Sequence, residues 1–147
     1  MSESELVQAA WEVKDRAYCP YSGYPVGAAV LDELGSIYTG CNVENVSFPA
    51  GICAERSAIV KMVSERGRKI KAVAVATADG GLPCGICLQV MLEFADSPSD
   101  VSILASSAPG TWQRFTLMDL LPHGFRSELP VRETRQNKTS TEPPMRA

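Results

Sequence analysis

Three cysteines and one glutamate have the types and the spacing to build a catalytic metal site. Cys53 and Glu55 lie in the stretch Cys-Ala-Glu-Arg, and Cys84 and Cys87 lie in the stretch Pro-Cys-Gly-Ile-Cys. Thiolates suit Zn²⁺, which prefers four ligands in a tetrahedron. Three protein ligands leave the fourth position for water, and a carboxylate two residues from a ligand can handle the protons of that water. These residues predict a zinc-activated water that attacks an electrophilic carbon.

The same residues also allow other functions. A Cys-x-x-Cys pair occurs in thiol redox proteins and in structural zinc sites, so Cys84 and Cys87 alone leave three functions open. Cys53 and Glu55 favour the catalytic site, because they complete the three-cysteine form of the known zinc deaminase signature. A redox function would leave Glu55 without a role. His123 is the only histidine, which leaves little material for a Ser-His or Cys-His triad.

Each motif must begin a helix if its side chains are to meet. Within a helix, side chains two positions apart point about 200° apart, so Cys53 and Glu55 share a site only if Cys53 stands at the helix start. Cys84 and Cys87 are three positions apart, which one helical turn brings together. Helix N-termini also favour thiolates over thiols. We expect Arg56 to support the site by hydrogen bonds to sulfur, which offset the negative charge of three thiolates and Zn²⁺.

The hydrophobic pattern predicts four helices and five strands. The helices are expected at residues 6–18, 53–65, 84–94 and 116–121, and the strands at 26–31, 36–41, 70–76, 101–105 and 111–115. Gly67 is expected to end the second helix. The alternation indicates an α/β layered domain, and the hairpin at 32–35 indicates a mixed sheet. Residues 1–129 are interpreted as one catalytic domain, and the polar residues 130–147 as a flexible tail.

Composition narrows the class of partner. The 147 residues include 14 Lys and Arg against 17 Asp and Glu, for a net charge of −3. This balance argues against nucleic acid, whose phosphates need clustered cations. The acidic start does not resemble a secretory signal, and no apolar run approaches the ~18 residues of a membrane span. The odd number of cysteines favours metal or thiol roles over disulfides, and Cys19 and Cys41 are expected to be small buried residues. We therefore expect a cytoplasmic protein that acts on a small, weakly charged substrate.

Five segments together resemble a known family, the small, homotetrameric type of cytidine deaminase. The segments are residues 17–22, 26–29, 40–45, 53–56 and 83–87, and the resemblance runs in order from about Leu6 to Leu129. It implies a three-layer α/β/α sandwich with a mixed five-stranded sheet and one Zn²⁺ per subunit. It also implies hydrolysis of cytidine and 2′-deoxycytidine to the uridine analogue and ammonia, as in pyrimidine salvage.

The resemblance also implies a role for each matching residue. Zinc would be bound by Cys53, Cys84 and Cys87, and Glu55 would shuttle protons. The side chains of Asn42 and Glu44 would bind the ribose 3′-hydroxyl, and the Ala54 backbone amide would contact the pyrimidine carbonyl. Tyr24 would line the pocket wall. Phe125 would reach into the site of a neighbouring subunit.

Three positions depart from the family pattern. Leu88 stands where the family has arginine, Tyr24 where it has phenylalanine, and Phe48 where it has tyrosine; we expect Phe48 to be a core aromatic. Leu88 removes a cation near the metal, and Tyr24 adds a hydroxyl group at the pocket. Two alternatives remain open beside thiol redox chemistry: deamination of another aminopyrimidine nucleoside such as blasticidin S, and a catalytically silent zinc-binding scaffold.

Overall fold

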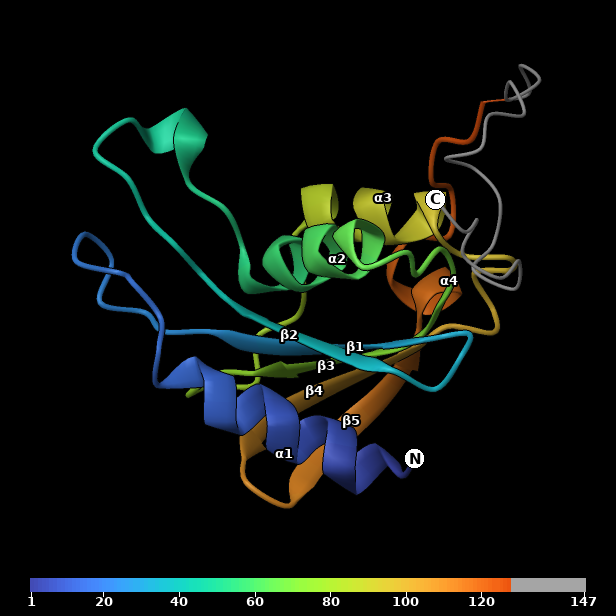
Figure 1. The fold of residues 1–147 in the computed structure, drawn as a ribbon, viewed down its shortest axis with the longest axis horizontal. Coiled ribbons are helices and arrows are strands. Elements are labelled where there is room, and N and C mark those ends of the chain that lie inside the picture. The colour runs from blue at the N-terminus through green and yellow to red at the C-terminus, as the bar shows by residue number, and fades with distance from the viewer. Residues whose placement is uncertain (128–147) are drawn as a thin grey trace, which may run out of the picture.

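The computed structural model describes residues 1–127, and their elements form one mixed sheet with helices on both faces (Figure 1). The strands are β1 (Gly27–Asp32), β2 (Ile37–Cys41), β3 (Ile70–Ala76), β4 (Ser102–Ala108) and β5 (Thr111–Thr116). Their order across the sheet is β2-β1-β3-β4-β5. The β3–β4 pair is parallel and the other three pairs are antiparallel. The predicted α/β class with a mixed five-stranded sheet is confirmed.

The two faces of β3 explain the layers. Its valines, Val73 and Val75, join a core with residues of α2 (Ala54–Ser64), α3 (Gly85–Glu93) and α4 (Leu117–Leu120). Its alanines pack on the other face against residues of α1 (Glu3–Lys14), where the small side chains let the helix approach closely. Because successive strand residues point to opposite faces, one apolar strand serves both cores. Figure 1 shows α1 on one side of the sheet and α2 and α3 on the other.

The first predicted helix differs from the structure at both ends, since it spans Glu3–Lys14 rather than residues 6–18, and the second ends differently from the prediction. The first helix begins at Glu3 because Ser2 caps it: the Glu5 backbone N–H donates to the Ser2 hydroxyl, and the Glu5 carboxylate accepts from the Ser2 N–H in return. After α2 it is Arg66, with φ of 77°, that adopts the left-handed conformation expected of Gly67. Gly67 serves close packing instead, since a Cβ there would lie 2.5 Å from Met62 Cγ.

Gly40 brings α2 against the sheet. A Cβ at this position in β2 would lie 2.5 Å from the Ala58 backbone nitrogen and 2.7 Å from the Ala54 carbonyl oxygen. The absence of a side chain therefore lets the first turn of α2 rest directly on β2. On the other side of the site, α3 forms part of the crossover between the parallel strands β3 and β4, so its first turn follows the C-terminal end of β3. Both helix starts lie where the sequence motifs require them.

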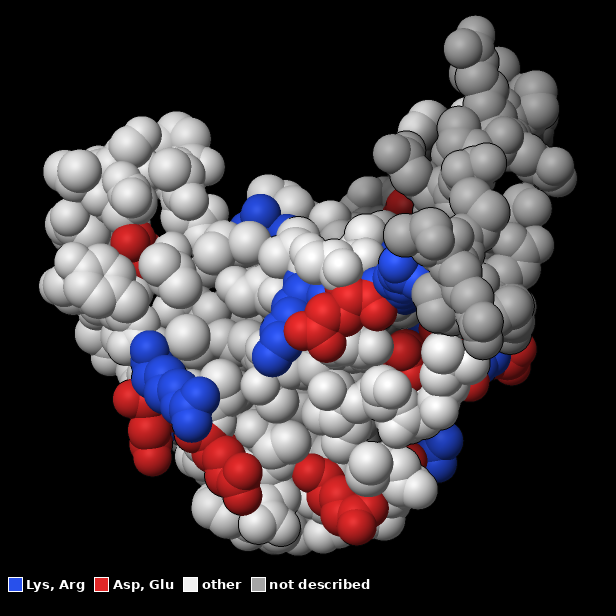
Figure 2. Space-filling view, in the orientation of Figure 1, with Lys and Arg blue, Asp and Glu red and all other residues white. Residues whose placement is uncertain are grey.

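The surface shown in Figure 2 carries both signs of charge side by side, with Lys and Arg next to Asp and Glu. In the part of the chain that the structure describes, no helix has the length and the apolar character needed to cross a membrane. The predicted tail at 130–147 lies outside the described residues.

Candidate active site

Three cysteine sulfurs converge from the starts of two helices. Cys53 is the N-cap of α2 and Cys84 the N-cap of α3, both with extended backbone, and the buried Cys87 lies in the first turn of α3. The Sγ atoms of Cys53 and Cys84 are 4.0 Å apart, and those of Cys84 and Cys87 are 3.5 Å apart. Tetrahedral Zn²⁺ with bonds of about 2.3 Å holds its sulfur ligands about 3.8 Å apart. The three sulfurs therefore fit a zinc ion, and Cys53 stands at the helix start as the motif predicted.

The pKa values of two of the cysteines are shifted in opposite directions. Hydrogen bonds from Cys87 and from Arg56 lower the pKa of Cys53 to about 5. The pKa of Cys87 is raised by its hydrogen bond with the Cys53 sulfur, by burial and by the negative charge of Glu55. Arg56 Nη2 donates to Cys53 Sγ at 3.3 Å, which is the predicted support from Arg56. A thiolate next to a guanidinium and at a helix start suits a soft cation.

Glu55 lies beside the sulfurs but out of solvent. It is the second residue of α2, its residue exposure is 5%, and the Cys87 thiol donates to its Oε2 at 3.6 Å. Burial raises the pKa of the Glu55 carboxyl above its usual value. The structure thus brings a buried carboxyl group with a raised pKa into contact with the group of three sulfurs.

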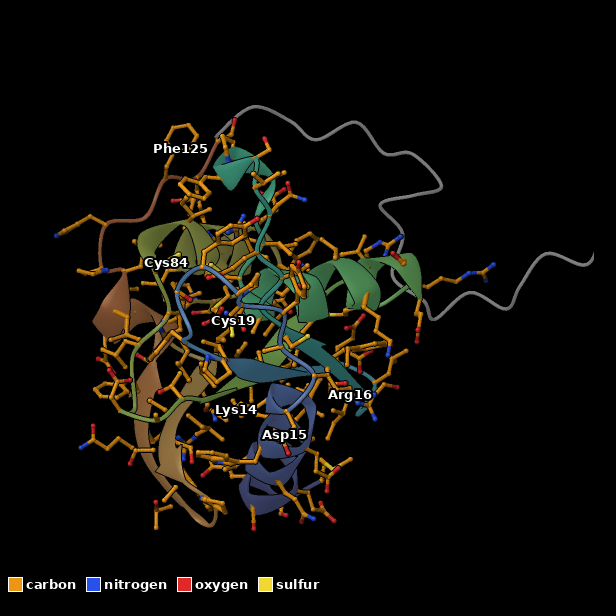
Figure 3. All side chains as sticks on the ribbon, turned by 90° about the vertical axis from the view of Figure 1, so that its left-hand side faces the viewer. Lys14, Asp15, Arg16, Cys19, Cys84 and Phe125 are labelled. Carbon is orange, nitrogen blue, oxygen red and sulfur yellow. The ribbon has the colours of Figure 1, made fainter. Side chains whose placement is uncertain are left out.

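A pocket of about 250 Å³ opens onto this group. Seven of the residues predicted for the site line it together: Tyr24, Asn42, Glu44, Cys53, Ala54, Glu55 and Cys84. Cys87 lies buried behind the pocket wall. Phe125 lies outside it, on the segment after α4, with 77% of its surface exposed (Figure 3). The structure therefore brings the residues predicted for the site together within one chain, with Phe125 as the exception.

Asn42 is held firmly at the pocket wall. Its Oδ1 accepts from the Val26 N–H at 2.9 Å, and its Nδ2 donates to the Tyr24 carbonyl at 2.8 Å. Asn42 directly follows β2, and its side chain connects the end of that strand to the segment that enters β1. These two bonds fix the orientation of the amide, so the remaining donor and acceptor positions point in set directions.

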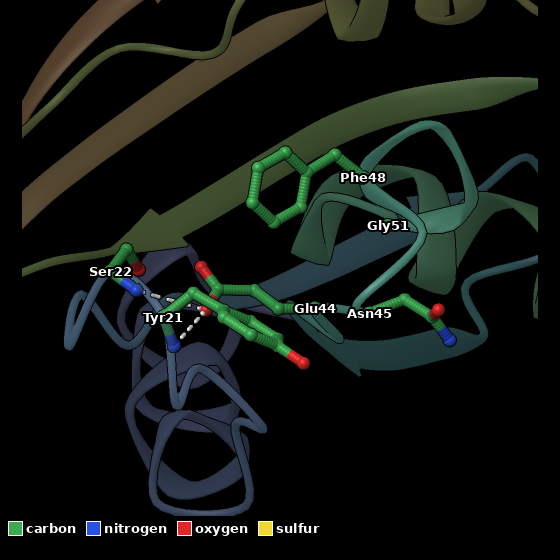
Figure 4. A pocket seen from close by; sticks show the side chains of 6 residues that line it. All are labelled: Tyr21, Ser22, Glu44, Asn45, Phe48 and Gly51. Atoms are coloured by element: carbon green, nitrogen blue, oxygen red, sulfur yellow. Dashed lines mark hydrogen bonds between the residues drawn. The ribbon is translucent and has the colours of Figure 1, made fainter.

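Glu44 joins this pocket to a second hollow of about 360 Å³. Its Oε1 accepts from the backbone N–H groups of Tyr21 at 2.9 Å and Ser22 at 3.1 Å (Figure 4). Hydrogen bonds from Ser22 and Tyr21 lower the pKa of Glu44, so it stays ionised. The expectation that Phe48 is a core aromatic is wrong: it is 75% exposed, and its ring packs edge to face with Tyr21 at 5.8 Å between ring centroids.

Sequence reasoning missed one group of pocket residues. The Tyr24 hydroxyl donates to Asp79, and the Gly81 N–H donates to both Asp79 Oδ1 and Thr77 Oγ1. Thr77, Asp79 and Gly81 belong to the loop between β3 and Cys84, which the sequence identified only as a glycine-rich connection. The signal was present in Tyr24, whose hydroxyl departs from the family pattern and needs a partner when half-buried.

Three other residues lie away from the pocket. Leu88 points into the core beneath α3, so it packs among apolar side chains. Cys19 and Cys41 are half-buried rather than fully buried as predicted, and neither belongs to the sulfur group. Cys41 Sγ donates to the Arg16 carbonyl at 3.4 Å.

Known proteins resemble this chain in sequence and in fold. Residues 1–103 match the cytidine and deoxycytidylate deaminase zinc-binding region. A cytidine deaminase of Sporosarcina psychrophila is 41% identical over 130 residues, which cover 87% of this chain and 94% of that protein. One from Mycobacterium tuberculosis is 40% identical over 121 residues, covering 81% and 86%. The crystal structure of cytidine deaminase from Burkholderia pseudomallei superposes with a TM-score of 0.78 at 36% identity, covering 85% of this chain and all of that one. The chain therefore belongs to the family of cytidine and deoxycytidylate deaminases, whose zinc its three sulfurs fit.

Proposed function

We propose that this protein hydrolyses cytidine and 2′-deoxycytidine to uridine and 2′-deoxyuridine, with release of ammonia. One observation carries the proposal: a pocket of about 250 Å³ is lined by Cys53, Cys84 and the buried Glu55, and the carboxylate lies 3.6 Å from the sulfur of Cys87, which completes a group of three sulfurs at zinc spacing. The relatives named cytidine deaminase support the same activity.

Cys53, Cys84 and Cys87 would hold the zinc ion, which would supply an activated water for attack at C4 of the pyrimidine. Glu55 performs the proton transfers. It accepts a proton from the attacking water and delivers it to N3 of the ring, then takes the second proton from the C4 hydroxyl that has formed and delivers it to the departing amine. Burial keeps its pKa raised, so the same carboxyl group holds and releases the proton within one turnover. Arg56 holds Cys53 as a thiolate.

The pocket wall has groups suited to a nucleoside. Asn42 and Glu44 bind the ribose 3′-hydroxyl in this proposal: both line the pocket, and the backbone N–H groups of Tyr21 and Ser22 hold the Glu44 carboxylate in place through Oε1. The Ala54 N–H is at the first position of α2, where no carbonyl of the helix accepts it, and it donates to the pyrimidine carbonyl. A substrate without the hydroxyl leaves these polar groups unpaired, which selects against it.

Charge in the pocket favours a nucleoside over a nucleotide. Glu44 and Glu55 line it, Asp79 stands beside Tyr24 and Gly81 at its edge, and none of its lining residues is Lys or Arg. A 5′-phosphate needs cationic or N–H partners and would meet carboxylates here. Among the two substrate types in the family's name, cytidine is therefore the proposed one, in a role such as pyrimidine salvage.

A homotetramer is the proposed assembly. Large apolar side chains remain exposed: Tyr21 and Phe48 line the second hollow, Ile86 lies in the first turn of α3, and Phe125 follows α4. Exposed apolar surface of this kind is typical of an interaction site. A second copy that covers them would bring its Phe125 to the pocket, which supports the predicted role of Phe125 in a neighbouring site.

The experiment measures zinc content, ammonia release and the cytidine-to-uridine absorbance change with the purified full-length chain. One zinc per chain and turnover of cytidine and deoxycytidine are expected, with none in the Glu55→Gln variant. Cytosine, cytidine monophosphate and blasticidin S are the comparison substrates. A zinc-loaded protein that deaminates none of them would be the silent scaffold, and dithiol–disulfide cycling of Cys84 and Cys87 without zinc would identify a redox protein.

A further inference from the structure

The Gln89 side chain forms hydrogen bonds with both backbone polar groups of Phe125. Its Nε2 donates to the Phe125 carbonyl at 2.6 Å, and its Oε1 accepts from the Phe125 N–H at 3.0 Å. The carboxamide thus matches the donor and the acceptor of a single residue that lies 36 positions away in the chain. Gln89 itself lies on α3, two residues after Cys87. The helix that carries two of the sulfurs also fixes the position of Phe125.

The neighbours of Phe125 are fastened to the same helix. Arg126 Nη2 donates to the carbonyl of Ala95 at 2.8 Å and to that of Leu92 at 3.4 Å, which attaches it to the C-terminal end of α3 and to the residues just beyond it. Gly124 lies so close that a Cβ there would be 2.5 Å from Leu92 Cδ2. Three consecutive residues are therefore held against α3 by different contacts.

These contacts fix the backbone at Phe125, whose ring is exposed. The Phe125 side chain is 77% exposed and points outward from the fold (Figure 3). Fixing a backbone costs conformational entropy, and here the fixed residue contributes little apolar burial to its own subunit. Contacts of this kind present the ring to something outside the subunit.

We propose that Gln89 is a positioning residue for substrate binding, which sets Phe125 at the place where its ring enters the pocket of a second copy of this chain. The inference rests on the role of Phe125 in the proposed function. Gln89 touches neither substrate nor metal. It acts through Phe125, and α3 thereby serves the metal centre of its own subunit and the substrate pocket of the neighbouring one.

The Gln89→Ala variant tests the positioning. Loss of two hydrogen bonds frees the Phe125 backbone, so KM for cytidine should rise about fivefold to tenfold, while kcat stays within about twofold and zinc remains at one per chain. Gln89→Met keeps the length and the helix propensity of the side chain and is measured in parallel, so that it decides the outcome if the alanine variant does not fold. The matched control is Gln8→Ala, an exposed glutamine on α1 that bonds only to Glu12 among the described contacts, which should leave KM unchanged.

A double-mutant cycle separates positioning from a general structural role. Phe125→Ala should raise KM at least as much as Gln89→Ala, and adding Gln89→Ala to Phe125→Ala should change KM no further, because residues that act through one group are not additive. An equal effect of Gln89→Ala in both backgrounds overturns the inference. An effect of Phe125→Ala without one of Gln89→Ala overturns it too, and leaves the role of Phe125 intact. An unchanged KM in Phe125→Ala removes the role of Phe125 itself.

Mixed assemblies test whether the ring serves another copy. Subunits with Glu55→Gln have no turnover but keep Gln89 and Phe125 in place. Co-assembled with Gln89→Ala subunits, they supply correctly held rings to the active sites of the latter, so the KM of the mixture should return toward the wild-type value. A KM that remains at the Gln89→Ala value would show that the ring serves its own subunit, against the proposal.

Discussion

The Tyr24 hydroxyl donates a hydrogen bond of 2.5 Å to Asp79 Oδ1. The bond joins the segment that enters β1 to the loop between β3 and α3, and Tyr24 and Gly81 on either side of it line the substrate pocket. The bond from Tyr24 is the main reason that the pKa of Asp79 is lowered, and burial together with Asp79 raises the pKa of Tyr24. An ionised carboxylate and a neutral phenol therefore stand together at the edge of the pocket at neutral pH.

This carboxylate leads to a prediction on phosphorylated substrates. Cytidine monophosphate should be deaminated with a kcat/KM about 100-fold or more below that of cytidine, because its phosphate meets Asp79 and Glu44 without a cation among the lining residues. Asp79→Asn should narrow the ratio of the two kcat/KM values, most clearly at low salt. Asp100→Asn is the control, since Asp100 precedes β4 at the opposite end of the parallel pair. Equal rates on both substrates would contradict the prediction.

Glu55→Gln should remove turnover and leave the metal. Loss of the proton-transfer group is expected to lower kcat by at least about 100-fold, while zinc content stays at one per chain, because Glu55 is not among the three sulfur donors. The rate and the metal content are measured on the same sample. Loss of zinc together with activity would assign Glu55 to metal binding instead.

The same variant should be more stable than the wild type toward high pH when both proteins are free of metal. Because burial raises the pKa of Glu55 in the folded state, the stability due to its protonated form is complete below the unfolded pKa of about 4.3 and is lost as pH rises through the folded pKa. Gln stays neutral throughout. The Tm of metal-free Glu55→Gln should therefore match the wild type near pH 4 and exceed it increasingly toward pH 8. Glu93→Gln, at an exposed position on α3, should show no such trend.

Only the cysteines of the sulfur group should matter for zinc. Cys87→Ser removes a buried donor, and the purified variant should hold less than half the zinc of the wild type and unfold at a lower temperature, since the metal stabilises the folded state by mass action. Removal of zinc from the wild type by a chelator should lower its Tm in the same way. Cys41→Ser lies outside the group and should keep one zinc per chain. Equal loss in both variants would argue against the assigned ligands.

Gly40→Ala should separate packing from chemistry. Its methyl group would meet the backbone of α2 at 2.5 Å, which forces the helix that carries Glu55 away from β2. Such overpacking costs about 1–3 kcal/mol of unfolding free energy, measured by urea unfolding of the metal-free protein. Gly85→Ala is the control, because a Cβ there meets nothing within 4 Å, and its stability should be unchanged or slightly higher. If both variants unfold alike, the close approach at Gly40 does not limit stability.

The sequence by itself determined the chemistry and most of the elements. Cys53, Cys84, Cys87 and Glu55 could be identified because ligand type and short spacing are local properties, and because a proline or an N-cap shows where a helix begins. The strand at 70–76 was predicted with the bounds it has, since its run of small and β-branched residues is also a local pattern.

The tertiary structure alone decided what depends on residues far apart in the chain. Periodicity could not show that Phe48 is exposed, that Leu88 belongs to the core, or that Arg66 rather than Gly67 takes the left-handed turn. Nor could it pair Tyr24 with Asp79 or Gln89 with Phe125. Spacing fixes which side chains share a face within one or two turns, whereas contacts across 36 or 55 positions depend on how the helices pack on the sheet, and only the folded chain sets that packing.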